Sequence, residues 1–294
     1  MAEPGETAAL IALLRLGRRP SSEYAELVET SQSALAVLRE ELTHDGPQIS
    51  LLSEDPEPVL RQAQADLARW IEAGAEVLTV LDPSYPRNLR QVHDRPPVLF
   101  IAGALQPGDD RSVSVIGSRR ASANGLAAAE RIAVDLVGAG FTVVSGLASG
   151  IDTAAHRSAL AAGGRTLAVI GTGLEHRYPP ENAGLQEQIA GQCAVVSQFW
   201  PETSPSRETF PLRNAVMSGL TLGTVIVEAS VRSGARVQAR RALAHGRPVF
   251  LAPALLDQPW AEELAARPGV HIVEEPGQII ETVKRLNATD ILTE

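Results

Sequence analysis

Short apolar runs rich in β-branched residues recur along the chain, and each is followed by a polar, glycine-containing cluster and an amphipathic stretch. The pattern is clearest over residues 113–156, where the apolar runs are residues 113–116 and 143–144. It predicts strand, loop, helix, strand, loop and helix, in that order. Because strands joined by a crossover helix run parallel, this stretch is predicted to form a βαβ unit.

The same alternation continues toward the C-terminus. Further strands are expected over residues 166–170, 194–197, 223–227, 248–251 and 270–273. Helices are expected over residues 183–190, 213–220, 233–245, 260–266 and 278–286. Since the apolar runs lack polar alternation, they indicate an α/β fold whose mostly parallel sheet is covered on both faces.

Two further strands precede the βαβ unit, at residues 77–81 and 98–101, and we expect them to extend the sheet at one edge. Upstream of them, the pattern predicts helices over residues 8–16, 24–28, 34–42 and 59–73. We therefore expect a small helical domain, residues 1–75, followed by an α/β domain, residues 76–294, with its core in residues 111–252.

A chain of 294 residues is long enough to bury a sizeable core. The first apolar run, residues 8–14, is short and follows acidic residues, and no apolar stretch has the length of a bilayer span. We therefore expect a cytoplasmic protein without a membrane partner. Cys193 is the only cysteine, which excludes a disulfide framework and predicts a buried structural thiol.

The net charge of −9 is unevenly distributed along the chain. Residues 1–110 carry −9 and residues 251–294 carry −5, whereas residues 111–250, with 14 basic and 9 acidic side chains, carry +5. All 14 of these cations are arginines; genome composition accounts for the scarcity of lysine but not for the central excess. Because a guanidinium group binds phosphate through two donors, a phosphate-bearing partner is expected in this central part.

Loops at strand ends carry the candidate chemistry, because parallel sheets bind ligands where such loops expose backbone N–H groups and helix N-termini. The G-x-G-x-x-G fingerprint and the P-loop motif are absent, which disfavours NAD, FAD and P-loop nucleotide binding. We expect an anion site instead, where glycine permits close backbone approach and arginine supplies charge. Its candidate residues are Gly117, Ser118, Arg119, Arg120, Ser145, Gly146, Gly171, Gly173, Arg213, Asn214, Ser233 and Gly234.

Several other polar residues fit structural roles. Ser149 and Asp152 form an S-x-x-D pattern, for which we predict helix capping rather than catalysis. Asp152 and His156 are four residues apart on one helix face, which fits an acid–base pair, but we expect a helix-face hydrogen bond between them beneath the loop. Glu228 ends a strand, where it is either a catalytic carboxylate or a partner that orients an arginine.

Arg232, Arg236 and Arg240 are spaced at four residues, which fits either a basic binding stripe or a solvated helix face. No nucleophile–base pair, pair of acids or metal-ligand cluster stands out in the sequence. We therefore predict no catalytic residue, no metal and no cofactor.

Taken as a set of motifs, the stretch from Tyr85 to Leu251 resembles the DNA-processing protein A (DprA, also called Smf) family. The matches occur in the family's order and include Y-P-x-x-L at 85–89, V-G-S-R at 115–119, S-G-x-A-x-G-I-D…A-H at 145–156, G-x-G-L…Y-P…N at 171–182, F-P-x-R-N…S-G-L at 210–220 and E-A…S-G at 228–234. So many ordered matches are more specific than any single motif.

The resemblance implies an extended Rossmann-like, doubly wound domain after a helical, SAM-like domain. It implies single-stranded DNA binding without nucleotide hydrolysis, protection of incoming DNA in transformation, loading of a RecA-type recombinase onto it, and a homodimer. The implied DNA contacts are Gly117, Ser118, Arg119, Ser145, Gly146, Arg213 and Asn214. With only 4% aromatic residues, phosphate contacts and arginine stacking are expected to dominate.

The chain departs from the family pattern in its C-terminal part. Gln238-Ala239 replaces the usual Thr-Ala, and no G-x-N-x-L-I segment follows Pro253. Because the sequence stops at Glu294, the C-terminal winged-helix domain of many members is not expected.

Two alternative functions stay open. A domain of this kind also fits a sensor of a small nucleotide ligand. An N-glycosidase similar to phosphoribohydrolases would use Glu228, but that family's P-G-G-x-G-T loop is reduced here to Gly223-Thr224.

Overall fold

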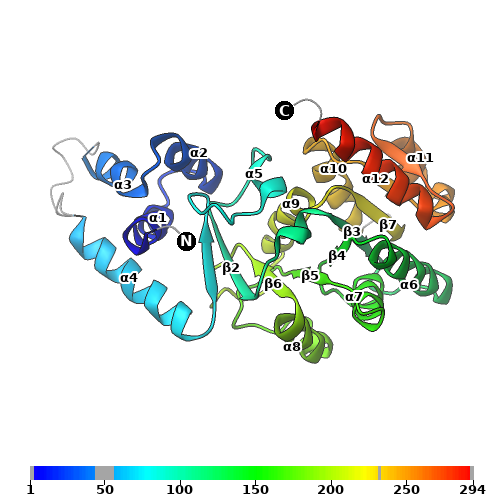
Figure 1. The fold of residues 1–294 in the computed structure, drawn as a ribbon, viewed down its shortest axis with the longest axis horizontal. Coiled ribbons are helices and arrows are strands. Elements are labelled where there is room, and N and C mark those ends of the chain that lie inside the picture. The colour runs from blue at the N-terminus through cyan, green and yellow to red at the C-terminus, as the bar shows by residue number, and fades with distance from the viewer. Residues whose placement is uncertain (1–2, 44–55, 231–232, 292–294) are drawn as a thin grey trace.

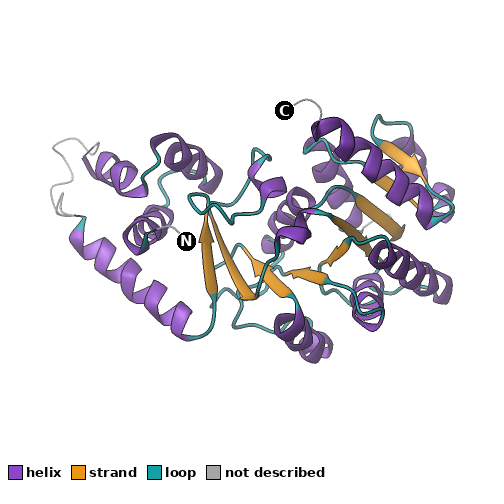
Figure 2. Cartoon of the chain, in the orientation of Figure 1, coloured by secondary structure: helices purple, strands orange, loops and turns teal. Residues whose placement is uncertain are grey.

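A computed structural model describes residues 3–43, 56–230 and 233–291 and contains one nine-stranded sheet with helices on both faces (Figures 1 and 2). The strand order is β1-β2-β6-β5-β4-β3-β7-β8-β9. The strands are β1 (Glu76–Thr79), β2 (Val98–Gly103), β3 (Ser112–Gly117), β4 (Thr142–Ser145), β5 (Thr166–Val169), β6 (Ala194–Ser197), β7 (Thr224–Glu228), β8 (Val249–Leu251) and β9 (Val270–Ile272).

The sheet is parallel from β6 through to β9, whereas β2 is antiparallel to both β1 and β6. The stretch β5-β4-β3-β7-β8-β9 has the 3-2-1-4-5-6 order of a doubly wound, Rossmann-like sheet, which confirms the predicted fold class. The pair β1 and β2 extends the sheet at one edge, as predicted. The order reverses between β3 and β7, so their carboxyl ends flank a crevice.

Helices cover the two faces of the sheet because strand side chains alternate between them. Val115 belongs to the apolar core under the first group of helices, and Ile116 to the core under the second. The first group is α6 (Ala123–Gly138), α7 (Ile151–Ala161), α8 (Ala183–Gln192) and α12 (Pro276–Ile291). The second group is α9 (Thr209–Leu220), α10 (Ala235–Ala244) and α11 (Pro259–Ala265).

The N-terminal helices lie at the β1–β2 end of the molecule (Figure 1). They are α1 (Pro4–Leu16), α2 (Ser21–Ser31), α3 (Ala34–Thr43) and α4 (Glu57–Glu72). Trp70 of α4 stacks on Trp200 at 5.4 Å between ring centroids and meets Phe100 of β2 edge-on at 5.1 Å. Glu29 of α2 pairs with Arg90 at 2.7 Å and with Arg95. One continuous cluster of buried apolar side chains therefore runs from these helices into the sheet.

The predicted helices and strands are present, with shifted boundaries. The helix expected at residues 213–220 begins at Thr209, and the last helix occupies Pro276–Ile291 rather than residues 278–286. The short helix α5 (Arg87–Arg90) and the 3-10 turns Pro107–Asp110, Pro180–Asn182 and Pro253–Asp257 were not predicted, because such short segments show no hydrophobic period. Cys193 is buried, as expected.

Within the described residues, no helix combines the length and the apolar character needed to cross a bilayer.

Candidate nucleic-acid interface

An open cavity of about 790 Å³ lies at the switch point between β3 and β7. Its wall includes the carboxyl ends of these strands, the loops that follow them, the start of α7 with the loop before it, and parts of α9 and α10. The predicted residues that line it are Gly117, Ser118, Arg119, Arg120, Arg213, Asn214, Ser233 and Gly234. The sheet topology thus brings together loops that are far apart in the sequence.

At Gly117, the last residue of β3, the backbone packs closely against neighbouring segments. A Cβ at this position would lie 2.6 Å from Cγ1 of Ile151 and 2.7 Å from the carbonyl oxygen of Glu228. The carbonyl of Ser118 accepts the Ile151 N–H at 3.2 Å, and its hydroxyl accepts the Arg120 N–H at 3.2 Å. These contacts hold the loop backbone in place and leave the Arg120 side chain exposed at its tip.

Arg213 reaches the cavity from α9, although it is only 6% exposed. Its Nη1 donates to the carbonyl oxygen of Val169 at 2.8 Å, while its buried Nε has no partner among the described residues. Burial lowers the pKa of Arg213, the charge of Asp152 opposes this, and the charge of Arg119 adds to it. Because a guanidinium group stays protonated even so, Arg213 places a fixed positive charge in the cavity floor.

A smaller cavity of about 130 Å³ adjoins the first one and shares part of its lining. The Arg119 guanidinium lies 5.5 Å from the centroid of the Phe210 ring, which lies 5.7 Å from the Tyr178 ring. Both rings line the smaller cavity. The predicted residues in its lining are Arg119, Gly146, Gly171 and Arg213. Arg119 and Arg213 thus face the same two cavities from different elements.

Two predicted site residues lie outside both cavities. Ser145 is fully buried, and its hydroxyl donates to the carbonyl oxygen of Val115 at 2.6 Å. At Gly173, a Cβ would lie 2.0 Å from the carbonyl oxygen of Trp200 and 2.2 Å from that of Pro201. Both residues therefore shape the loops from behind and do not present groups to the cavities.

The predicted capping role of Ser149 is wrong. The N-cap of α7 makes no side-chain capping bond, and the Ser149 hydroxyl instead donates to Oε1 of Glu181 at 2.7 Å. Asp152 accepts the N–H groups of Gly146 at 3.1 Å and Ala148 at 3.4 Å. Burial raises the pKa of Asp152, and the guanidinium of α9 and these N–H donors oppose the rise. The carboxylate therefore closes the loop before α7 rather than pairing with Ser149.

The predicted hydrogen bond between Asp152 and His156 is also wrong. His156 Nδ1 lies 2.7 Å from the hydroxyl of Thr166, and its Nε2 is buried without a partner among the described residues. Burial lowers the pKa of His156 to about 3, and the charge of Arg213 contributes to the shift. His156 is therefore a neutral, buried core residue whose ring is positioned by Thr166 of β5.

Glu228 anchors the start of α6. Its carboxylate accepts the Ser122 N–H at 3.1 Å and the Ser122 hydroxyl at 2.6 Å. The same hydroxyl, which is the N-cap of α6, accepts the Gly125 N–H at 3.0 Å. Neither expected role of Glu228 is visible in these contacts. The role as a support for the β3–α6 loop was missed because Ser122 is distant in sequence.

The arginine series on α10 is only partly described. Arg236 lies over the ring of Trp260, 5.5 Å from its centroid, and Arg240 is exposed. Arg232 falls outside the described residues, so the proposed stripe is limited here to two side chains.

Three further residues belong to the site but were not singled out. Gln238 is fully buried in the wall of the larger cavity, and its Oε1 has no partner among the described residues. Phe210 and Tyr178 form the aromatic side of the smaller cavity. Phe210 is part of the motif F-P-x-R-N and Tyr178 of the motif Y-P, so these motifs could have identified both rings from the sequence.

The charges available at the larger cavity are positive. Its two lining carboxylates, those of Asp152 and Glu228, are occupied by N–H and O–H donors. Neither Arg119 nor Arg120 forms an ion pair with another described residue. A cavity with free guanidinium groups and engaged carboxylates suits an anionic partner.

Comparison with known proteins finds a matching family model and similar sequences. The family model of DNA recombination-mediator protein A matches residues 76–284. DNA processing protein DprA of Bacillus subtilis is 32% identical over 234 residues, which cover 79% of this chain and 79% of the relative.

Two solved structures share the fold. The crystal structure of DprA from Streptococcus pneumoniae superposes with a TM-score of 0.77 at 30% identity and covers 95% of this chain and 97% of that one. A DprA structure from Helicobacter pylori gives 0.64 at 24% identity and covers 72% of this chain and 96% of that one. The family match, the sequence relative and the shared fold agree: this chain belongs to the DNA recombination-mediator protein A family.

Proposed function

We propose that this protein acts in DNA processing by binding single-stranded DNA across the cavity at the β3–β7 switch point. The observation that carries the proposal is the placement of Arg119, Arg120 and Arg213 around one opening, with the lining carboxylates already engaged. Guanidinium groups hold successive phosphates without reading bases, so binding would be largely independent of sequence.

The aromatic side of the site adds to this argument. Phe210 and Tyr178 lie next to Arg119, where an unpaired base could stack on a ring while its phosphate meets the guanidinium. The Helicobacter pylori relative is described as binding single-stranded DNA. No chemical step is required of the site, and we propose that the protein is not an enzyme.

The finer role is proposed by analogy with the family. We propose that the protein protects single-stranded DNA and loads a RecA-type recombinase onto it during natural transformation, as a homodimer in the cytoplasm. In this proposal residues 1–75 form a helical domain that packs against residues 76–294, the DNA-binding domain. The family match, which begins at residue 76, supports this division.

An oligo-dT titration across ionic strength tests the DNA-binding site. If three phosphates are neutralised, the logarithm of the affinity should fall with the logarithm of salt concentration at a slope of about −2. A flat salt response, or tighter binding of duplex than of single strands, would contradict the proposal.

A filament assay tests the finer role. RecA-type recombinase is added to single strands already coated with a single-strand-binding protein, with and without this protein. Faster filament nucleation is expected when it is present. Unchanged nucleation with intact oligo-dT binding would reject recombinase loading and leave DNA binding standing.

A further inference from the structure

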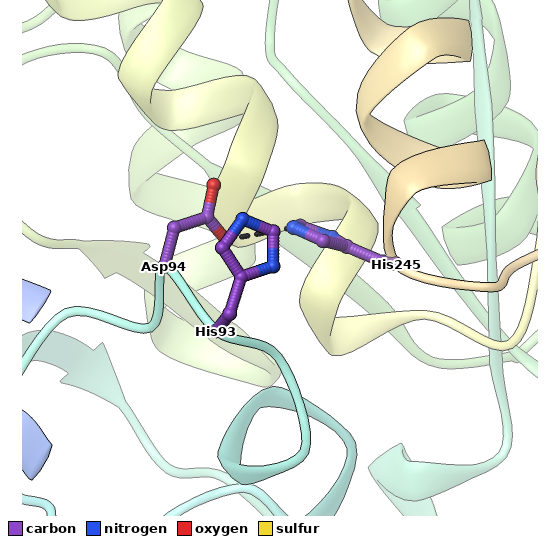
Figure 3. A group of neighbouring side chains, drawn as sticks. All are labelled: His93, Asp94 and His245. Carbon is purple, nitrogen blue, oxygen red and sulfur yellow. Dashed lines mark hydrogen bonds and ion pairs between the residues drawn. The ribbon is translucent and has the colours of Figure 1, made fainter.

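Outside the DNA site, His93, Asp94 and His245 converge on one point (Figure 3). His93 and Asp94 belong to the loop after α5, whereas His245 is the C-cap residue of α10. One ligand atom from each residue lies within 4.8 Å of the others. The three residues are distant in sequence, so only the packing of this loop against α10 brings them together.

The hydrogen bonds of His245 leave a position for a cation. The Ser218 hydroxyl lies 3.1 Å from the carbonyl oxygen of Ala215, to which it donates, and its oxygen lies 2.9 Å from Nδ1 of His245. In the neutral tautomer of His245 that carries its proton on Nδ1, this oxygen accepts the Nδ1–H. With Nδ1 protonated, the Nε2 lone pair of the neutral ring points at Oδ1 of Asp94, 2.7 Å away. In this tautomer the two facing lone pairs need a metal ion between or beside them, whereas in the other tautomer Nε2–H donates to Oδ1 of Asp94 and the proton takes that place.

His93 supplies a third ligand from the solvent side. Its side chain is exposed and its ring lies 5.6 Å from the His245 ring, nearly perpendicular to it. Zinc–nitrogen and zinc–oxygen bonds are about 2.0–2.2 Å, so tetrahedral ligand atoms lie about 3.4 Å apart. For an ion to bind, the Asp94–His245 pair, 2.7 Å apart, must open toward this spacing, and the exposed His93 side chain must rotate inward, which leaves a fourth position for water.

The surrounding groups hold the ligands in place. Ser218 orients His245, as a hydrogen-bond acceptor behind a metal-bound imidazole commonly does. Arg241 Nη1 lies 3.1 Å from Oδ2 of Asp94 and leaves Oδ1 directed at His245. Two imidazoles and one carboxylate give a bound divalent ion a net charge of +1, less than in the three-histidine sites that proteins use for zinc.

We propose that His93, Asp94 and His245 bind a borderline divalent metal ion of the zinc type, with water completing the coordination. The ion would join the loop after α5 to the end of α10. Arg95 ties the same loop to Glu29 of α2, and the segment before α10 lines the DNA cavity at Gly234. The site therefore links the N-terminal helices to one wall of that cavity.

Metal analysis of the full chain tests the proposal. After chelation and reloading with zinc, the parent should retain about one ion per chain on dialysis, and cobalt loading should give the visible spectrum of a four-coordinate ion with N and O ligands. His93→Ala removes only an exposed ligand and should weaken zinc binding at least tenfold. Asp94→Asn should do the same.

His176→Ala is the matched control, because the His176 ring is partly exposed and hydrogen-bonds only to the carbonyl of Glu202 among the described residues. It should retain the ion. A parent that binds no stoichiometric zinc, or a His93→Ala variant that binds zinc as the parent does, would overturn the proposal. Such a result would leave the cluster as a hydrogen-bonded ion pair only.

Discussion

The guanidinium group of Arg213 occupies the space that a side chain at Gly146 would fill. A Cβ built at Gly146 would lie 1.6 Å from Nη1 of Arg213 and 2.4 Å from its Cζ. The glycine after β4 therefore decides where a cation from α9 can lie, although neither residue's local sequence contains this information.

Gly146→Ala should displace Arg213 from its bond to the carbonyl of Val169. We expect a loss of about 2 kcal/mol in the free energy of unfolding, as for overpacking of a close contact, and about tenfold weaker oligo-dT binding. Urea unfolding and fluorescence anisotropy measure the two effects. Gly184→Ala is the control, because a Cβ there meets nothing within 4 Å, and it should leave both unchanged or slightly raise stability.

Arg119→Ala tests the exposed part of the site. Loss of one charge-assisted phosphate contact should weaken oligo-dT binding about tenfold and reduce the salt slope by about 0.7. Stability should hardly change, because no described residue forms an ion pair with Arg119. Arg131→Ala removes an exposed arginine of α6 outside the cavity and serves as the control. If Arg119→Ala binds oligo-dT as tightly as Arg131→Ala does, the DNA contacts lie elsewhere on the protein.

Arg213→Ala should differ from Arg119→Ala by harming the fold. It leaves the buried Asp152 without its neighbouring positive charge and the Val169 carbonyl without its donor. We expect about 2 kcal/mol lower stability together with weaker DNA binding. Arg157→Ala, an exposed arginine on α7, should be neutral in both measurements. A stable Arg213→Ala protein would show that the buried guanidinium does not support the cavity floor.

His156 should make stability depend on pH. Its ordinary pKa of 6.5 applies to the unfolded chain, whereas burial lowers it to about 3 in the folded protein. The unfolded state therefore binds more protons between these values, and stability is lost as the pH falls below 6.5. Between pH 7 and pH 5 the loss should be about 2 kcal/mol.

His156→Asn keeps a group that can bond to Thr166 but does not titrate, so this part of the pH dependence should disappear. Unfolding curves of the parent and the variant at both pH values give the comparison. The same pH dependence in both proteins would contradict the assignment to His156. His176→Asn, at a partly exposed site, should retain the parent's response.

Glu228→Ala separates a structural role from a catalytic one. Ser122 loses the acceptor for its N–H and hydroxyl, and α6 should be destabilised by about 1 kcal/mol, as when a helix cap is removed. Glu130→Ala, at an exposed position of the same helix, should have no such effect. If the parent released free base from nucleoside monophosphates and Glu228→Ala did not, the glycosidase alternative would be supported instead.

The sequence by itself determined the succession of strands and helices, because apolar runs and helical periodicity are local properties. It also indicated that Gly117 and Arg119 face a ligand site, since residues at strand ends share one edge of a parallel sheet. Arg213, expected in such a loop, lies within α9 instead. Their order in motifs carried the family resemblance. None of this required knowledge of which strands are neighbours.

Only the tertiary structure decided which candidates face the cavity. Ser145 and Gly173 have the same local signals as Gly117, yet the first bonds to a neighbouring strand and the second packs under another loop. The contacts of Glu228 with Ser122 and of His245 with Asp94 join segments far apart in the chain. A hydrogen bond or a steric contact depends on what lies across the sheet, and that partner is set by strand order and packing, which no local pattern specifies.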